Sequence, residues 1–307
     1  MYHGENKPRG AAISYYVNRP VEKQQVEEQY DKKKKRKKKT LKRKQNDNES
    51  EILKKELVKY DSIVLQIYDG ERLIRTLKQK APKEKGVYKI YWDMKEKGAD
   101  RPSRKIRKRK NEPSGTSVKP GQYRLKLSFG DQTSENRIDV EYDPRLNMST
   151  AATNEIYEAL KEMDKDQQTI ADAVKQLVES KAIAKELTSK LTKTDKERYT
   201  EDIKISKDIV KEIDRLIAFF LGKEDTRQGI TRNPEVTVMQ RYSTARRYVG
   251  SRYGHLTKTE RVLVDHYTTM MNEVLKEVNT FFNEHWKSYQ TRIESLQMSP
   301  FKTVKTF

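Results

Sequence analysis

The spacing of apolar side chains changes once along this 307-residue chain, and that change restricts its architecture more than any other feature. Before about residue 146, apolar residues alternate with polar ones, as at Tyr123, Leu125 and Leu127, which is the period of a β-strand. From residue 150 onward they recur at steps of three and four, which is the period of an amphipathic helix. The sequence therefore predicts a multidomain α+β protein, a β-domain followed by a helical domain.

The β-region has turn residues between its expected strands and no helical spacing within it. Asp69-Gly70 and Gly130-Asp131 favour tight turns, and Asp143-Pro144 closes the region because proline lacks a ladder donor. Residues 94–121, rich in Pro, Gly, Ser and basic residues, are expected to form a loop. The expected strands lie at residues 11–17, 63–68, 73–77, 87–92, 123–129 and 138–142. Two antiparallel sheets face to face, an immunoglobulin-like or fibronectin type III-like β-sandwich, would give these strands a common core.

Four segments follow from these patterns. Residues 1–20 contribute a first strand, residues 60–146 form the immunoglobulin-like β-sandwich, and residues 150–300 form a helical bundle. Residues 21–59 consist largely of Lys, Glu and Gln, so this stretch lacks the apolar surface needed to fold alone. Because these residue types favour helix, we expect a charged, helix-prone insertion that protrudes from the sandwich.

The helical region is predicted to be an antiparallel three- to four-helix bundle. Its expected boundaries are an N-cap at Asp195, a C-terminal Gly222, an N-cap and first residue at Asn233-Pro234, a capping box at Thr257 and Glu260, and a stop at Pro300. The apolar stripe expected on the first helix comprises Ile156, Leu160, Met163, Ile170, Val174, Leu177, Ile183, Leu187 and Leu191. The aromatic and methionine side chains of the last helix match core packing better than a cofactor site; they are Met270, Met271, Phe281, Phe282, Trp286 and Tyr289.

Two short basic runs carry eighteen of the twenty excess positive charges, so the charge belongs to two patches and not to the whole fold. Such patches bind nucleic acid, acidic polysaccharide or an anionic membrane surface, with a steep dependence on salt. A solvated charge run without a partner is the alternative interpretation. The possible polyanion-binding residues are Lys32, Lys33, Lys34, Lys35, Arg36, Lys37, Lys38, Lys39, Lys42, Arg43 and Lys44 in the first patch, and Arg104, Lys105, Arg107, Lys108, Arg109 and Lys110 in the second.

The chain lacks the residue patterns of common catalytic and metal sites. It has no cysteine, and none of its four histidines (His3, His255, His266 and His285) stands in an HExxH motif or beside an acidic cluster of metal-ligand spacing. No GxSxG, SxxK, Walker or GxGxxG motif occurs. We therefore expect no catalytic residue, no metal and no cofactor, and a chain that is not an enzyme on its own.

One further pattern concerns the surface of the helical region. Tyr242, Arg246, Arg247, Tyr248, Arg252 and Tyr253 interleave aromatic rings with arginines. This pattern indicates either a stacking and phosphate-binding surface, or a helix that packs tyrosines inward and displays arginines.

The first twenty residues lack the basic and apolar regions of a signal peptide, and no stretch approaches the ~20 apolar residues of a membrane span.

Several segments, in order along the chain, resemble a known family. They include GENKPRGAAISYYV, LQIYDGERLIRTL, VYKIYWDMKEKG, EPSGTSVKPGQYRLKLSFGDQ, VEYDPRLN, RQGITRNP, ARRYVGS and VNTFFNEHWKSYQTRIE. They look like the C-terminal region of bacterial sortilin-like or glycosyl-hydrolase-like proteins with Asp-box (BNR) β-propellers, of the Bacteroidetes type. In that family a charged insertion, an immunoglobulin-like domain and a helical region follow the propeller.

The resemblance implies a non-catalytic accessory and interaction module of a secreted, periplasmic or cell-surface protein. Its implied partner is the β-propeller domain of the parent protein, with other envelope proteins or polyanions as further partners. No Asp-box (S-x-D-x-G-x-T-W) occurs here, so no catalytic residue carries over. Two alternatives stay open: a polyanion-binding protein acting through the two basic patches, and a hydrolase fragment whose site needs a propeller that this sequence does not contain.

Overall fold

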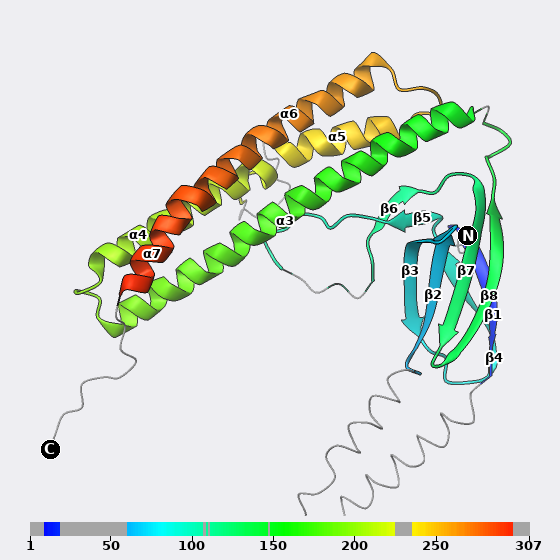
Figure 1. Cartoon of the computed structure of the whole chain (residues 1–307), viewed down its shortest axis with the longest axis horizontal. Helices are drawn as coiled ribbons and strands as arrows, with labels where there is room; N and C mark the ends of the chain where they lie inside the picture. Colours follow the sequence, from blue (N-terminus) through cyan, green and yellow to red (C-terminus); the bar gives the residue numbers. More distant parts are fainter. Residues whose placement is uncertain are drawn as a thin grey trace, which may run out of the picture. The chain divides into compact units, whose positions relative to one another are not determined.

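The protein consists of two compact units, seen in a computed structural model that describes residues 9–18, 60–106, 109, 111–146, 148–224 and 235–296 (Figure 1). The β-unit comprises Met1–Gly98 and Arg109–Asn147, and the helical unit comprises Ala99–Lys108 and Met148–Phe307. The expected order of a β-region followed by helices is confirmed. The whole of the expected insertion at 21–59, which includes the first basic patch, Lys32 to Lys44, lies outside the described residues.

A four-stranded antiparallel sheet forms the larger part of the β-unit, in the order β3-β2-β7-β8. Its strands are β2 (Ser62–Asp69), β3 (Arg72–Lys80), β7 (Gly121–Phe129) and β8 (Gln132–Val140). Gly70 and Gly130 stand in the two tight turns with positive φ angles of 58° and 60°, a region that glycine enters without steric cost. The hairpin at Asp69-Gly70 was predicted and is confirmed. The turn at Gly130-Asp131 is also confirmed, but the strand after it begins at Gln132 and not at residue 138 as expected.

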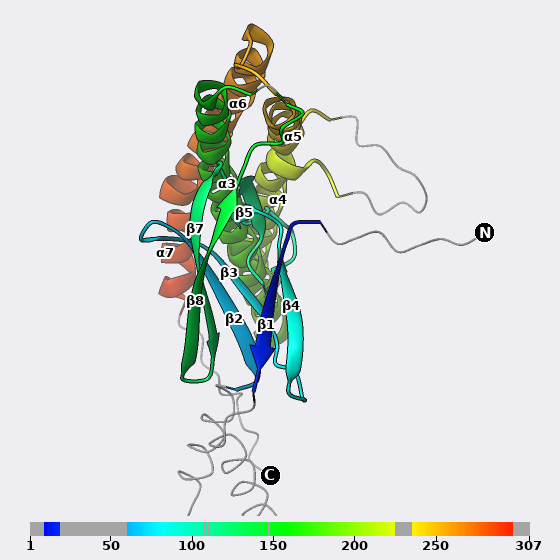
Figure 2. The same cartoon turned by 90° about the vertical axis from the view of Figure 1, so that its right-hand side faces the viewer.

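A two-stranded antiparallel sheet pairs β1 (Ala11–Val17) with β4 (Gly86–Trp92), as Figure 2 shows. One face of this pair and one face of the four-stranded sheet contribute to a single buried cluster, in which Trp92 packs edge-to-face on Tyr123 at a centroid distance of 5.5 Å. The members of this cluster alternate along each strand, because side chains of a strand point to opposite faces. Period-2 patterning therefore defines the core of the β-unit, as expected.

The expected loop at 94–121 contains two short strands that sequence reasoning missed, β5 (Lys95–Lys97) and β6 (Ser114–Ser117). Their backbones approach closely at Gly98 and Gly115: a Cβ on Gly98 would lie 2.6 Å from the carbonyl oxygen of Ser114. Strands of three and four residues with polar side chains carry no periodic signal. Their pairing depends on backbone contact between residues far apart in sequence, which explains the missed prediction.

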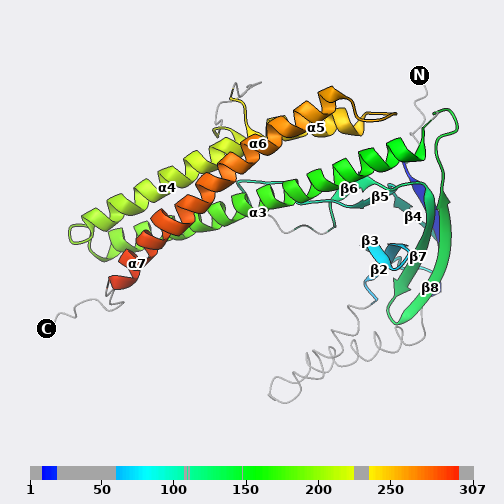
Figure 3. The ribbon, with the colours of Figure 1, turned by 45° about the horizontal axis from the view of Figure 1, so that its top comes forward.

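Four helices pack together in the helical unit (Figure 3). The first is α3 (Thr150–Thr194), capped by the Ser149 hydroxyl, which accepts from the backbone N–H of Ala152. At 45 residues it is about 68 Å long. Two shorter helices, α4 (Thr200–Leu221) and α5 (Val238–Gly250), pack on its C-terminal and N-terminal parts respectively. None of the described helices is both long and apolar enough to cross a membrane.

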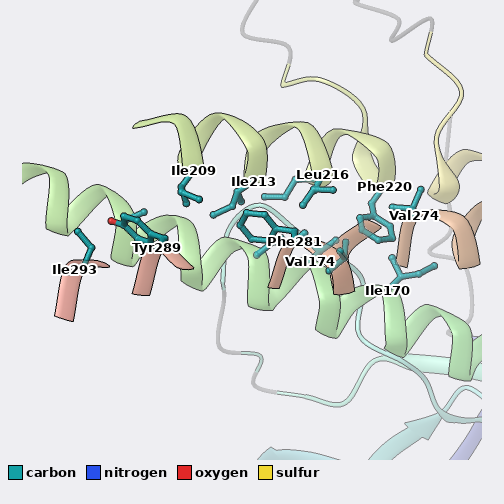
Figure 4. Close-up of a cluster of buried hydrophobic side chains, with 14 of the residues drawn as sticks. Ile170, Val174, Ile209, Ile213, Leu216, Phe220, Val274, Phe281, Tyr289 and Ile293 are labelled. Carbon is teal, nitrogen blue, oxygen red and sulfur yellow. The ribbon is translucent and has the colours of Figure 1, made fainter. Parts of the chain in front are cut away.

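The fourth helix runs without a break through α6 (Lys258–Thr280), the π-helical turn η1 (Phe281–Trp286) and α7 (Lys287–Ser295). Its apolar side chains join those of α3 and α4 in the largest buried cluster (Figure 4). Met271, Phe281 and Tyr289 are buried, and Met270, Phe282 and Trp286 pack against the cluster from its edge. These six side chains therefore contribute to core packing, as expected; the π-helical turn was not anticipated.

The apolar stripe of α3 differs from the prediction at one position. Ile170, Leu177 and Leu191 are fully buried, but Ile183 is 50% exposed and its neighbour Ala184 is fully buried in its place. The buried positions 170, 177, 184 and 191 repeat every seven residues, the spacing of a helix seam. The prediction that Ile183 belongs to the stripe was wrong. The seven-residue spacing selects Ala184, although its side chain is smaller.

Two helix boundaries also differ. The expected start of the third helix, Asn233-Pro234, lies outside the described residues, and α5 starts at Val238, where Thr237 and Gln240 form a capping box. Asp195 is the C-cap of α3, and the N-cap of α4 is Tyr199, after a turn whose Arg198 N–H donates to the Asp195 carboxylate. Gly222 at the end of α4 and the capping box of Thr257 with Glu260 are confirmed. The last helix ends at Ser295, and Pro300 lies outside the described residues.

Candidate functional site

The second basic patch includes an arginine that holds a helix end. The guanidinium of Arg104 donates to the backbone carbonyl of Gly222, the residue that terminates α4. Helix C-termini leave unpaired carbonyls and partial negative charge, so a cation is favourable there. Arg104 thus makes a structural contact within the helical unit. The sequence had indicated only polyanion binding for this arginine.

The same segment is attached to α3 through side-chain amides. Nε2 of the buried Gln167 donates to the carbonyls of Ala99 and Asp100, at 3.1 and 3.0 Å. The side-chain oxygen of Gln168 accepts from the N–H of Asp100 at 2.9 Å. The backbone of an irregular segment needs such partners where helices exclude water. Residues 99–104 are therefore fixed on the helical unit at both ends.

The remaining patch residues divide between solvent and the parts of the chain that are not described. Lys105 and Arg109 are exposed, and Lys105 has no ion pair among the residues described. Arg107, Lys108 and Lys110 lie outside the described residues, as do the eleven basic residues of the first patch, Lys32 to Lys44. The structure places three of the seventeen candidate residues, namely Arg104, Lys105 and Arg109. Polyanion binding by these residues stays a prediction.

A buried polar cluster joins α3 to α5 and α6. Asp164 on α3 forms an ion pair with Arg246 on α5 at 2.8 Å, and Arg246 also donates to the hydroxyl of Tyr242 at 3.2 Å. Two residues further along α3, Asp166 accepts a hydrogen bond from the hydroxyl of Tyr267 at 2.7 Å, and the rings of Tyr242 and Tyr267 pack edge-to-face at 5.5 Å. These contacts orient the three helices relative to one another.

Burial changes the acid–base properties of this cluster. Loss of solvent raises the pKa of Tyr242 to about 12 and the pKa of Tyr267 above its usual range. Burial also raises the pKa of Asp166, partly offset by the hydrogen bond from Tyr267. Raised tyrosine pKa values keep both hydroxyls protonated, so they act as hydrogen-bond groups that hold the helices and not as bases.

Two of the histidines make cross-helix contacts with glutamates. Nδ1 of His255 lies 2.8 Å from Glu155 of α3, which also binds Arg261 at 2.5 Å. Nδ1 of His285 lies 2.9 Å from Glu212 of α4. Within the described ranges, no group of three or more His, Asp or Glu side chains is arranged to hold a metal ion. His3 lies outside those ranges.

A groove between α5 and α6 has a volume of about 320 Å³. It is lined by Val236, Gln240, Arg241, Thr244, Leu263 and His266. Arg241 comes from α5 and His266 from α6, both exposed, and Val236 and Leu263 are the two apolar residues of the lining. No lining residue is acidic. Sequence reasoning did not find this groove, although the absence of Asp and Glu between Val236 and Thr259 was a visible signal.

The interleaved tyrosines and arginines of α5 point in different directions. Tyr242 is buried and Arg246 is paired, which agrees with a helix that packs tyrosine inward. Tyr248 and Tyr253 are exposed by 44% and 65%, and the guanidinium of Arg247 lies 5.8 Å from the ring of Tyr248. The pattern therefore serves core packing at one position and forms a polar and aromatic surface at the others.

Charged side chains also tie together the elements of the β-unit. Arg72 of β3 forms two parallel hydrogen bonds with the buried Glu96 of β5, both at 2.9 Å. The buried Arg75 donates to the Ser114 hydroxyl at 3.1 Å, and that hydroxyl donates to Asp93 at 2.6 Å. Two-point binding of this kind fixes geometry as well as charge. It attaches the short β5–β6 pair to the edge of the large sheet.

The β1–β4 outer face, which we define as Tyr16, Val87 and Tyr91, carries exposed apolar surface on the β-unit. These side chains are 63%, 71% and 40% exposed, and Tyr16 lies directly opposite Val87 in the strand register. Polar residues are the usual occupants of the solvent-facing side of an antiparallel pair. An exposed cross-strand pair of this type marks a candidate interaction surface.

Comparison of the chain with protein-family models, with curated protein sequences and with solved structures found no match.

Proposed function

We propose that this chain is a non-catalytic interaction module of a secreted or cell-envelope protein, in which a β-unit and a helical unit present surfaces to partner domains. The observation that carries the proposal is that the buried charged side chains are engaged in contacts within the protein. The described core contains five charged side chains, Arg75, Glu96, Asp164, Asp202 and Glu260, and each contacts another side chain or the backbone across or within elements. Buried charges engaged in this way stabilise the scaffold.

We further infer that the β-unit is an immunoglobulin-like or fibronectin type III-like sandwich. The support is the single buried cluster to which both the β1–β4 pair and the four-stranded sheet contribute. In such a sandwich the inner faces share one core and the outer faces meet solvent or partners. The β1–β4 outer face would then be available for docking.

The resemblance of the quoted segments to the C-terminal regions of Asp-box propeller proteins supports a propeller domain as partner. Its binding to the β1–β4 outer face is testable with the purified chain and a recombinant propeller from a protein that carries the same segments. Burying Tyr16 and Val87 at an interface would contribute about 1.5–3 kcal/mol each. We therefore expect the double variant Tyr16→Ser/Val87→Ser to bind at least about tenfold more weakly.

The matched control is Leu73→Ser, which removes an apolar side chain that is 46% exposed on β3 of the other sheet. It should bind as the unmodified chain does. Equal affinities for all variants would refute docking on the β1–β4 outer face. Turnover of glycoside or peptide substrates by the purified chain, abolished by substitutions within it, would refute the non-catalytic role.

Polyanion binding is the second candidate function. The observation in its favour is the exposure of Arg101 and Lys105, neither of which has an ion pair among the described residues, on a segment without acidic residues from Arg101 to Lys110. Retention on heparin should fall sharply when Lys32 to Lys44 is changed to Ser and Gln, and further when Lys105 is included. Unchanged retention would dismiss this candidate.

A further inference from the structure

Helix α5 and the loop between it and α6 have an unbalanced charge. Val236 to Thr259 contains five Lys and Arg residues and no Asp or Glu, in a chain where 36% of residues are charged. Arg246 is paired with Asp164, and Nε of Arg252 lies 3.9 Å from Glu260. Arg241, Arg247 and Lys258 are exposed and have no carboxylate partner among the residues described. Their positive charge is available to a partner.

Exposed apolar side chains gather in the same region of the chain. Among the described residues of the helical unit, six large apolar side chains are exposed, and four of them lie between residues 236 and 262. They are Val236 at 59%, Tyr248 at 44%, Tyr253 at 65% and Val262 at 37% exposed. Isolated exposed apolar residues are ordinary, but several of them close in sequence on α5, on α6 and on the segments next to α5 mark a candidate interaction surface.

One of these exposed side chains, Val236, also lines the groove between α5 and α6. The groove has a volume of about 320 Å³, and its lining includes Val236 and Leu263 as apolar residues, Arg241 from α5 and His266 from α6. Gln240 uses its side-chain oxygen in the capping box of α5, which leaves its amide N–H groups as donors. The carboxylates of α6 nearest in sequence, Glu260 and Asp265, do not line it. The groove therefore combines an apolar wall with hydrogen-bond donors.

We propose that the outer face of the α5–α6 hairpin is a docking site for an acidic, amphipathic helical segment of a protein partner. An apolar side chain of that segment would enter the groove between Val236 and Leu263, and its carboxylates would face Arg241 and Arg247. This is the helix-in-groove mode of recognition, in which apolar anchors give affinity and charge gives specificity. The inference rests on the proposed interaction role and adds a surface and a partner chemistry to it.

The chemistry of the groove favours a peptide over other anions. Aliphatic walls at Val236 and Leu263 match an aliphatic or aromatic side chain, whereas single-stranded nucleic acid is held by rows of stacking rings. No aromatic ring lines the groove, and the exposed ring of Tyr248 on α5 has the Arg247 guanidinium 5.8 Å from its centroid. Peripheral membrane binding uses projecting apolar side chains, and here the apolar surface lines a concavity.

A displayed library of helical peptides, with randomised residues and no charge bias, tests the inference when selected against the immobilised full-length chain. Affinities of the enriched peptides are then measured by fluorescence anisotropy. The key variants are Arg241→Glu, which reverses a groove charge, and Thr244→Trp, which fills the groove. The matched controls are Lys185→Glu and Ser189→Trp, which make the same kinds of change at exposed positions of α3. Circular dichroism confirms that all four variants fold.

We expect enriched peptides to be acidic, with apolar residues at helical spacing. Their affinity should fall about tenfold or more for Arg241→Glu and Thr244→Trp, and by less than about twofold for the two controls. Arg241→Lys should retain most of the affinity. Enrichment of peptides without acidic surplus, no enrichment at all, or equal losses in the α3 controls would overturn the inference.

Two further arms separate the possible sources of failure. A single-stranded oligonucleotide and vesicles containing phosphatidylserine are titrated with the same variants, and their binding should not change with Thr244→Trp. If they, and not the peptides, depend on both groove variants, the peptide assignment is wrong. Peptide binding that is lost with Tyr16→Ser and not with the groove variants would refute this site and leave the proposed interaction role intact.

Discussion

Replacing Tyr267 with phenylalanine removes one hydrogen bond from the helical core and little else. The lost bond joins the hydroxyl of Tyr267 to Asp166 over 2.7 Å, and the ring of Tyr267 is 1% exposed. Phenylalanine keeps the edge-to-face contact with Tyr242 at 5.5 Å. A hydrogen bond to a charged group contributes about 1.5–3 kcal/mol, so the Tyr267→Phe substitution should lower the free energy of unfolding by that amount at neutral pH.

The defect should shrink on acidification. Burial raises the pKa of Asp166 above its unfolded value, and the hydrogen bond from Tyr267 counteracts that rise. A carboxyl with a raised folded pKa contributes stability that is present below its unfolded pKa and is lost as pH rises through its folded pKa. Without Tyr267 the pKa of Asp166 rises further, so protonation recovers more stability in the variant. At acidic pH, once Asp166 is protonated, the difference should fall to about 0.5–1.5 kcal/mol, the range for a neutral hydrogen bond.

Urea denaturation followed by the helical circular dichroism signal measures this difference, because the helices belong to the helical unit. Tyr242→Phe is the matched control: its hydroxyl accepts from Arg246, which stays charged throughout the same pH range. Because this bond also involves a charged group, its cost should be about 1.5–3 kcal/mol, and it should be the same at neutral and at acidic pH. A Tyr267→Phe defect that is independent of pH, or that changes with pH no more than the defect of Tyr242→Phe, would refute this account of the cluster.

Three other substitutions test the packing and the turns. Ile170→Ala should destabilise the helical unit by about 2–5 kcal/mol, and Ile183→Ala by about 0.5 kcal/mol or less, in the same denaturation experiment; equal costs would contradict the observed seam. Gly130→Ala should lower the free energy of unfolding by about 2 kcal/mol, because φ is 60° and the new Cβ would lie 2.0 Å from the Tyr60 ring. Hydrogen exchange of the amides in β7 and β8 should become faster, and unchanged exchange rates would contradict this prediction. Thr257→Ala should cost about 0.5–2 kcal/mol through loss of the capping box, whereas an unchanged midpoint in urea would show that the cap is dispensable.

The candidate surfaces were only partly accessible to sequence reasoning. The basic patches were found because charge runs are local, but the contact of Arg104 with Gly222 joins residues more than a hundred positions apart. The β1–β4 outer face was not identified from the sequence. The alternation along β1 predicts two faces, but it does not indicate which of them is buried. The groove between α5 and α6 depends on the packing of two helices. Local composition indicated only the positive charge of its rim.

By itself, the sequence determined the features that depend on near neighbours. Period-2 and helical spacing gave the order of strands and helices, glycine-containing turns gave the two hairpins, and the capping box at Thr257 gave the start of α6. These signals are local because a turn or a helix cap is completed within a few residues.

Only the tertiary structure decided the features that depend on distant parts of the chain. It paired β5 with β6, placed Ala184 in the seam where Ile183 had been expected, and introduced a π-helical turn at Phe281–Trp286. It also joined Asp164 to Arg246 and formed the groove between α5 and α6. The physical reason is that packing selects among faces and registers that local preferences leave nearly equal in energy.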